Sequence, residues 1–223
     1  MAEIVDYKDM TVETLRTTED PAIVVAVALA IVMKQDTEAD IIPVSEETCK
    51  KLWLAEHASV FEHVNYTFLI EGVSRSFLAQ ITRQRTASPT SGSQHYQDYS
   101  DYPMAIDTKH KDDMWHALDT SLDAYKDMVD TGVPREEARQ ILPNASTVNY
   151  LWTIDALNLF KFLRQRCCNR NVKEMRIFAN KVLKIAQADF PALFNHAGPQ
   201  CYEGECQQGL FNMQCKAGTW VKI

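Results

Sequence analysis

The sequence predicts an α-rich α+β domain that contains a small sheet. Several segments carry apolar residues at helical spacing. One segment, residues 64–71, instead alternates and is rich in β-branched and aromatic side chains, which is typical of a strand. Hydrophobic residues make up 46% of the 223 residues and charged residues 24%, so there is enough apolar material for a core. Without a repeat or a low-complexity linker, we expect a single domain over 1–223, with a Cys-rich tail from about 195.

The first half of the chain is expected to form three helices and one strand. Asp20 followed by Pro21 is a typical helix start, and Ser45 followed by two glutamates is another. In chain order, we expect a helix from Pro21 to about Lys34, a helix from Ser45 to near His57, a strand from Val64 to Glu71 ended by Gly72, and a helix from Ser74 to Thr82.

The second half begins with a loop and continues mainly as helices. Residues 86–93 contain five Ser or Thr residues, one Pro and one Gly, which indicates a loop, and residues 94–103 are expected to be irregular. Helical spacing then predicts helices at 111–130, from Pro134 to just before Pro143, at 148–166 and at 172–188. The segment 148–166 has the strongest amphipathic pattern of the chain.

The overall charge and the ends of the sequence limit the class of protein. The net charge of −7 argues against a protein that coats nucleic acid polymers or a membrane surface, since both need a basic face. The longest apolar run, 21–33, is shorter than the roughly 20 residues that a membrane span needs. The acidic N-terminus is unlike a secretory signal, so we expect a cytoplasmic protein with reduced cysteines.

Two arginines lead into the hydroxyl-rich loop. Arg83 and Arg85 are followed by Ser88, Thr90, Ser91 and Ser93. Guanidinium groups bind phosphates with two hydrogen bonds, and hydroxyls and loop amides complete such anion sites. A solvated basic turn beside a flexible loop is the structural alternative.

The expected helix 148–166 carries charge on an apolar stripe. Asp155, Leu159, Phe162 and Arg166 share one face of this helix at 3.6 residues per turn. Charged groups on an apolar stripe are costly unless they are paired or bound to a ligand. The pattern therefore indicates either a ligand site or a structural ion pair.

Two groups of residues have side chains that bind metals. His57, Glu62 and His63 lack the His spacing of a zinc protease helix, so capping of a helix end is the ordinary alternative. In the tail, Cys201, Cys206, Cys215 and His196 are candidates for a tetrahedral zinc site, but their spacing is wider than is typical. We expect no metal, and free or buried thiols in the tail.

The stretch HASVFEHVNYTFLIEGVSRSFLAQITRQRTASPTSGSQHY resembles the signature region of flavin-dependent thymidylate synthases, the ThyX family. That family carries Arg-His-Arg, seven residues and then Ser, and this spacing is kept by Arg83, Arg85 and Ser93. Downstream, ARQILPNASTVNYLWTIDALNLFKFLRQR is similar to the family's Ala-Arg-x-x-Leu-Pro stretch and the helix that follows it. The resemblance extends over about residues 20–190.

The resemblance implies an α+β fold with a central antiparallel sheet flanked by helices, over a single catalytic domain. It also implies a homotetramer with FAD at the subunit interfaces, methylenetetrahydrofolate as carbon donor and NADPH as reductant. The expected reaction is the reductive methylation of dUMP to dTMP without a cysteine nucleophile, and the Pro-Cys-His motif of the cysteine-dependent thymidylate synthases is absent from the sequence. The cofactor would carry the chemistry while the protein positions the reactants.

Site residues follow from the matched positions. The resemblance implies catalytic roles for Arg166 and Ser93, with Arg166 polarising the pyrimidine ring. It implies that the cofactor is bound by His63, Arg83, Gln84, Arg85, Asp155 and Lys161. It implies that the nucleotide is bound by Gln80, Ser91, Ser93, His95, Arg139 and Arg166.

The sequence departs from the family pattern at several of these positions. Gln84 replaces the central His, His95 replaces an Arg, and Asp155 and Lys161 each replace an Asn. A carboxylate at Asp155 favours a base edge that donates hydrogen bonds, as the amino group of cytosine does. The alternatives are therefore a dCMP methylase, a dUMP or dCMP hydroxymethylase, and a nucleotide- or flavin-binding homologue without activity.

Overall fold

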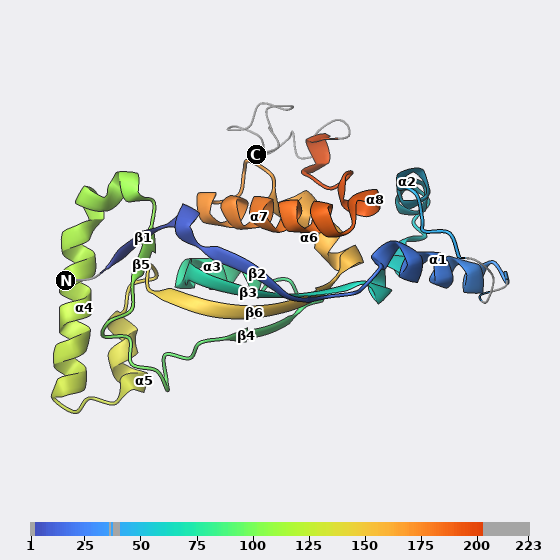
Figure 1. Cartoon of the computed structure of the whole chain (residues 1–223). Coiled ribbons are helices and arrows are strands. Elements are labelled where there is room, and N and C mark those ends of the chain that lie inside the picture. Colours follow the sequence, from blue (N-terminus) through green and yellow to red (C-terminus); the bar gives the residue numbers. More distant parts are fainter. Residues whose placement is uncertain (1–2, 36, 38–40, 203–223) are drawn as a thin grey trace. The chain divides into compact units, whose positions relative to one another are not determined.

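The computed structural model describes residues 3–35, 37 and 41–202 (Figure 1). The chain divides into two compact units, which are described separately. The first unit is built from residues 3–13, 69–85 and 89–152, and the second from residues 14–68, 86–88 and the chain from 153 onward. Among the described residues, four strands contain residues of both units, so the expectation of a single catalytic domain stays a prediction.

An antiparallel sheet of four strands runs through the fold. Its order is β2 (Thr11–Thr17), β3 (Asn65–Ser74), β6 (Thr147–Asp155) and β4 (Ser88–Ser91). A second sheet pairs β1 (Ile4–Asp6) with β5 (Met104–Ile106) in parallel, with Ile4 opposite Met104. The predicted α+β class, with an antiparallel sheet flanked by helices, is therefore confirmed.

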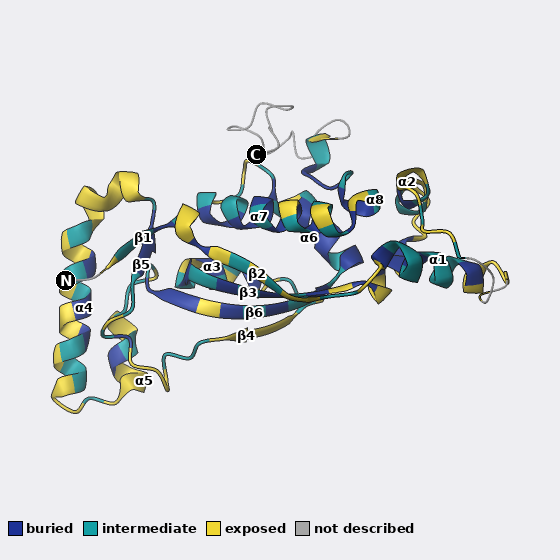
Figure 2. Ribbon diagram, viewed as in Figure 1, coloured by how far each residue is buried: buried dark blue, intermediate teal, exposed yellow. Residues whose placement is uncertain are grey.

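Three helices and several 3-10 turns complete the first unit. The helices are α3 (Arg75–Ile81), α4 (Lys111–Asp130) and α5 (Arg135–Ala138), and the 3-10 turns are Tyr7–Asp9, Thr108–His110 and Arg139–Ile141. Along α4, Leu118 and Leu122 pack with Met104 of β5, while Tyr125 packs with Tyr99. The side of α4 with these residues is buried, and much of the rest of the helix is exposed (Figure 2).

The second unit is mainly helical. Its elements are α1 (Pro21–Val32), α2 (Glu46–Leu54), a 3-10 turn (Ala58–His63), α6 (Ala156–Arg166), α7 (Lys173–Asp189), α8 (Pro191–Phe194) and a 3-10 turn (Gln200–Tyr202). Aromatic rings hold these elements together. The ring of Phe194 lies 5.9 Å from that of Tyr66 and 6.2 Å from that of Phe160, and Phe162 meets Phe178 of α7 at 6.0 Å.

The expected helix at 148–166 is wrong in its first half. Residues 147–155 form β6, in which Val148, Tyr150, Trp152 and Ile154 are buried in alternation, and the helix starts only at Ala156. The shared stripe of Asp155, Leu159, Phe162 and Arg166 is therefore wrong as well, because Asp155 precedes the helix. Strand pairing with β3 and β4 overrides the local helical pattern of this segment.

Two smaller expectations also differ from the structure. Gly72 does not end the strand but lies inside β3, where its φ of +73° is a conformation that glycine adopts without steric cost. The expected loop at 86–93 contains β4, a short and fully exposed edge strand whose composition gives no strand signal. The remaining predicted helices, and the strand after Val64, are confirmed to within a few residues.

Two further observations concern the thiols and the membrane. Cys49, Cys167, Cys168 and Cys201 are free thiols, as expected, whereas Cys206 and Cys215 lie outside the described residues. Within the described part of the chain, no helix has both the length and the apolar character required to cross a bilayer.

Candidate functional site

One face of α3 forms a wall of a hollow in the first unit. Arg75, Leu78, Ala79 and Thr82 lie at i, i+3, i+4 and i+7 and all line this hollow. The opposite face of the helix is buried, and Ser74 fixes the start of the helix by accepting a hydrogen bond from the backbone N–H of Phe77 at 3.0 Å. The helix is thereby oriented so that the Arg75 face points into the hollow.

The other walls come from two irregular segments. Gln94 follows β4, and the segment after α5 contributes Arg139, Gln140, Leu142, Pro143 and Asn144. The backbone N–H of Ser76 donates to the carbonyl of Asn144 at 3.2 Å, which ties this segment to α3. The hollow has a volume of about 480 Å³, which is in the range of small-molecule sites.

Two guanidinium groups give the hollow a positive charge. Nη1 of Arg75 donates to the carbonyl of Gly92 at 3.3 Å, and Nε of Arg139 donates to the carbonyl of Glu136 at 3.2 Å. Both arginines are half-buried, and each has further N–H groups in its fork for a ligand. No carboxylate occurs among the described residues that line the hollow. The arrangement suits an anion such as a phosphate.

The predicted nucleotide residues of the first unit are partly brought together here. Arg139 lines the hollow, while Ser93 and His95 are the neighbours of Gln94 in the chain. Nδ1 of His95 lies 3.4 Å from Oε2 of Glu136, the residue whose carbonyl holds Arg139. The remaining predicted residues of this unit, which do not line the hollow, are Gln80, Arg83, Gln84, Arg85 and Ser91. Their roles, and that of Ser93, stay predictions.

A second hollow, of about 590 Å³, lies in the second unit. Its apolar walls are Trp53, Leu54, Ala58 and Leu157, and its polar groups are Ser59, Glu56, Glu62 and Lys161. Apolar side chains that include the planar indole of Trp53, together with hydroxyl, carboxylate and ammonium groups, fit a planar ring system that carries polar substituents, as a flavin nucleotide does. Lys161 was predicted to bind the cofactor, and His63, the exposed neighbour of Glu62, does not line the hollow.

Asp155 and Arg166 lie at opposite ends of α6. Asp155 is the N-cap, and both of its carboxylate oxygens accept hydrogen bonds from Asn158. Arg166 is half-buried in the last turn, where Nη1 donates to Oδ1 of Asn171 at 3.1 Å. The predicted roles of Asp155 at the cofactor and of Arg166 at the base stay predictions.

Sequence reasoning gave no ligand-binding role to Arg75 or Gln94. The sequence signal for Arg75 is a charged side chain on the face of α3 away from the buried Phe77 and Ile81. Gln94 had no such signal, because it lies in an irregular segment whose path depends on contacts far away in the sequence.

The candidate zinc site of the sequence includes His196, which lies near the end of the described part of the second unit. Nε2 of His196 lies 3.2 Å from Oε1 of Glu46, and no group of three metal-binding side chains occurs in the described part of the chain. Because Cys206 and Cys215 fall outside that part, the zinc candidate formed by Cys201, Cys206, Cys215 and His196 stays undecided.

Known proteins are similar to this chain along most of its length. The family model described as thymidylate synthase complementing protein matches residues 13–192. The flavin-dependent thymidylate synthase of Geobacter sulfurreducens is 33% identical over 96% of this chain and 97% of its own length, and that of Clostridium tetani is 34% identical over 75% and 76%.

A solved structure has the same fold. The UMP/dUMP methylase PolB from Streptomyces cacaoi, bound to 5-Br dUMP, superposes with a TM-score of 0.74 over 86% of this chain and 96% of its own, at 20% sequence identity. Together with the match over residues 13–192, these similarities show that the chain belongs to the ThyX family of flavin-dependent thymidylate synthases.

Proposed function

We propose that this protein catalyses the reductive methylation of dUMP to dTMP, with FAD as cofactor, methylenetetrahydrofolate as carbon donor and NADPH as reductant. The observation that carries the proposal is the hollow in which Arg75 and Arg139 present guanidinium groups, with no carboxylate among the described residues that line it. A nucleoside monophosphate such as dUMP has a dianionic phosphate, which two guanidinium groups bind well.

The relatives support the proposal. Both named relatives are flavin-dependent thymidylate synthases, and the solved structure of PolB is that of a UMP/dUMP methylase with a brominated dUMP bound. At about a third identity over most of the chain, a shared reaction class is the simplest expectation.

The first unit would bind and orient the nucleotide. Arg75 and Arg139 would hold the phosphate, and the amide of Gln94 would hydrogen-bond the nucleotide at the facing wall. Leu142 and Pro143 line the same hollow and would exclude water from one side of the ligand. Ser93 and His95 would complete the phosphate site. We propose separately that Arg166, which belongs to the second unit, polarises the pyrimidine ring.

The second unit would hold the flavin, which supplies a hydride to the pyrimidine when bound. Trp53 and Leu157 would contact its rings, while Lys161 would bind an anionic part of the cofactor. Asp155 and His63 are the further residues of this unit that we propose for cofactor binding. For the first unit, we propose the same role for Arg83, Gln84 and Arg85. The protein is proposed to be a cytoplasmic homotetramer.

The two buried thiols, Cys49 and Cys167, do not resemble catalytic nucleophiles. Burial, together with the charge of Glu46, raises the pKa of the Cys49 thiol to about 12, and burial, with a contribution from Cys168, raises that of Cys167 to about 12. Both thiols are therefore protonated at neutral pH, whereas the thiolate is the nucleophilic form. Neither of these two thiols is therefore suited to attack the base.

The mass of the nucleotide product tests the proposal. Purified protein is incubated with FAD, NADPH, methylenetetrahydrofolate and either dUMP or dCMP, with reactions that lack FAD or the folate as controls. The proposal predicts that the mass of dUMP increases by one CH2, because a methyl group replaces a ring hydrogen, and that this increase requires both FAD and the folate. A variant with Arg139→Ala, assayed in parallel, separates turnover at this site from that of a contaminating enzyme.

Other products would support one of the alternatives. A hydroxymethylated product, or turnover of dCMP alone, would contradict the proposal and favour a relative with a changed substrate or product. Binding of dUMP or flavin without any product would favour a homologue without activity. The size of the particle in solution, measured by light scattering with and without FAD, tests the tetramer.

A further inference from the structure

The segment that brings Gln94 to the hollow has no regular secondary structure. Residues 92–103 contain only turns and bends between β4 and β5. A turn at its start is closed by the backbone N–H groups of Tyr96 and Gln97, which both donate to the carbonyl of Ser93. Beyond this turn, the path of the segment depends on side chains from other elements.

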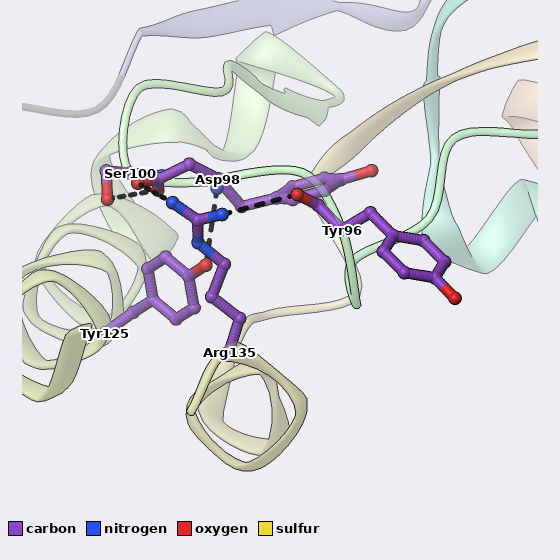
Figure 3. A network of polar contacts seen from close by, with 6 residues as sticks. Tyr96, Asp98, Ser100, Tyr125 and Arg135 are labelled. Atoms are coloured by element: carbon purple, nitrogen blue, oxygen red, sulfur yellow. Dashed lines mark hydrogen bonds and ion pairs between the residues drawn. The ribbon is translucent and has the colours of Figure 1, made fainter. Parts of the chain in front are cut away.

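Arg135 of α5 supplies two of those contacts (Figure 3). Its Nη1 donates to the carbonyl of Tyr96 at 3.3 Å, and its Nη2 donates to Oδ2 of Asp98 at 3.3 Å. The other oxygen of Asp98 accepts hydrogen bonds from the backbone N–H and the hydroxyl of Ser100, at 2.9 and 2.6 Å. The guanidinium therefore contacts two points of the segment through two nitrogens held in one plane, whereas the three donors of an ammonium group share a single nitrogen.

The same short stretch of chain also holds the opposite wall of the hollow. Glu136 accepts the Nε–H of Arg139 on its carbonyl at 3.2 Å, and its carboxylate lies 3.4 Å from Nδ1 of His95. Arg135 and Arg139 are four residues apart across the junction of α5 and the following 3-10 turn. Residues 135 and 136 thus contact residues 95–98, and the carbonyl of residue 136 also holds the side chain of Arg139.

We propose that Arg135 is a positioning residue that sets the separation between Gln94 and Arg139, the two polar walls of the hollow. This inference rests on the proposed nucleotide site and goes beyond it, because Arg135 does not line the hollow and would not touch the ligand. The side chains of Arg135 and Asp98 are 42% and 43% exposed, so their pairing contributes little to global stability. Its effect is on the geometry of the segment.

Steady-state kinetics of the holoenzyme with dUMP tests the proposal through three variants. Arg135→Ala should raise the KM for dUMP about tenfold, which corresponds to about 1.4 kcal/mol of lost binding, with kcat and the melting temperature nearly unchanged. Asp98→Asn keeps the acceptor for Ser100 but loses the charge, and should show a smaller increase. Arg135→Lys should lie between wild type and Arg135→Ala, because the donors of an ammonium group share one nitrogen and fit two separated acceptors less well than the guanidinium does.

Lys126 provides the matched control. It forms another ion pair between a helix and the same segment, with Nζ 3.5 Å from Oδ1 of Asp101, on the far side of Asp98 from Gln94. Lys126→Ala should leave the KM for dUMP unchanged. Equal KM increases in Arg135→Ala and Lys126→Ala, or an unchanged KM in Arg135→Ala, would overturn the positioning role.

A second measurement does not depend on the reaction. Hydrogen exchange of the backbone amides at 96–100 in the nucleotide-free protein should be faster in Arg135→Ala than in wild type, and unchanged in Lys126→Ala. If the wild-type protein neither binds nor turns over dUMP, the proposed function fails, and the exchange rates still decide whether Arg135 orders the segment. Unchanged exchange in Arg135→Ala would reject the proposal.

Discussion

Asp155 and Asn158 are joined by two hydrogen bonds at the start of α6. The backbone N–H of Asn158 donates to Oδ1 of Asp155 at 2.9 Å, and its side-chain amide donates to Oδ2 at 2.6 Å. Both carboxylate oxygens are thus used in capping the helix that carries Arg166. The presence of Asp in place of the family's Asn therefore has a local structural explanation and does not require a cytosine base.

The first prediction separates the capping role of Asp155 from a role in choosing the base. Asp155→Ala should lower the free energy of unfolding by about 1 kcal/mol, because the first turn of α6 loses its cap. Asp155→Asn keeps an acceptor and should lose only a fraction of that amount. Urea denaturation measures both values. If Asp155→Asn changes the ratio of kcat/KM for dUMP and dCMP by more than about tenfold, the residue reads the base and the capping explanation is insufficient.

Prediction from the sequence succeeded where the pattern of an element is local. The sequence correctly predicts the helix at 111–130 and the strand from Val64, because the spacing of apolar residues and the residues at the ends of each element indicate the same structure. The pattern of apolar residues at 147–155 is compatible with the period of a helix and with that of a strand. This segment forms a strand because it pairs with β3 and β4, which lie far away in the sequence. The parallel pair β1 and β5, about one hundred residues apart, has no local signal at all.

The residues of the candidate site also fall into two groups: those that a local motif identifies and those whose position depends on contacts far away in the sequence. Arg139 was placed by a motif, and the structure puts it in a hollow. Gln94 was missed because its position depends on the path of an irregular segment that is held by Arg135 and Asp98. A sequence motif predicts individual residues with suitable chemistry. Which other residues line the same hollow is determined by contacts between segments that are distant in the sequence.

The second prediction concerns the two arginines of the hollow. Arg139→Ala and Arg75→Ala should each raise the dissociation constant for dUMP by about ten- to a hundredfold, because each removes a charge-assisted hydrogen bond to the phosphate. Calorimetric titration with dUMP and with deoxyuridine, which lacks the phosphate, measures this loss. The variants should bind deoxyuridine as wild type does. A similar loss for both ligands would place the arginines away from the phosphate.

The third prediction concerns acid stability and Asp6. Burial alone would raise the pKa of this carboxyl, but hydrogen bonds from the Thr108 hydroxyl and from the backbone N–H groups of Lys8 and Thr108 lower it to about 2. The unfolded chain, with a pKa of about 3.9, is therefore protonated first as the pH falls. The stability that Asp6 contributes is complete above about pH 4 and is lost progressively as the pH falls through about 2.

Thr108→Val provides the test for Asp6, because it removes the hydroxyl donor while keeping the shape of the side chain. The free energy of unfolding should be lower in Thr108→Val than in wild type at neutral pH, by roughly 1 kcal/mol, and the two proteins should converge towards pH 2. Denaturant titrations at several pH values measure this difference. A difference that stays constant down to pH 2 would mean that the hydroxyl contributes by packing and not through the carboxylate.

The fourth prediction concerns the turn that holds Arg166. Oδ1 of Asn171 accepts from Nη1 of Arg166 at 3.1 Å, and Nδ2 of Asn171 donates to the carbonyls of Gln165 and Cys168 at 2.7 and 3.3 Å. One side chain thus closes the end of α6 and fixes one nitrogen of the guanidinium. Asn171→Asp keeps the acceptor for Arg166 and loses the donor, whereas Asn171→Ala loses both.

If Arg166 acts on the base, kcat for dUMP should fall about tenfold or more in Asn171→Ala and much less in Asn171→Asp, while both variants lose stability through the missing donor. Asn169→Ala is the control, because Asn169 in the same turn accepts from Arg176 and not from Arg166. In an Arg166→Lys background, Asn171→Ala should have little further effect on kcat, since the group that it orients is gone. Independent effects of the two substitutions would show that Asn171 serves the turn alone and does not act through Arg166.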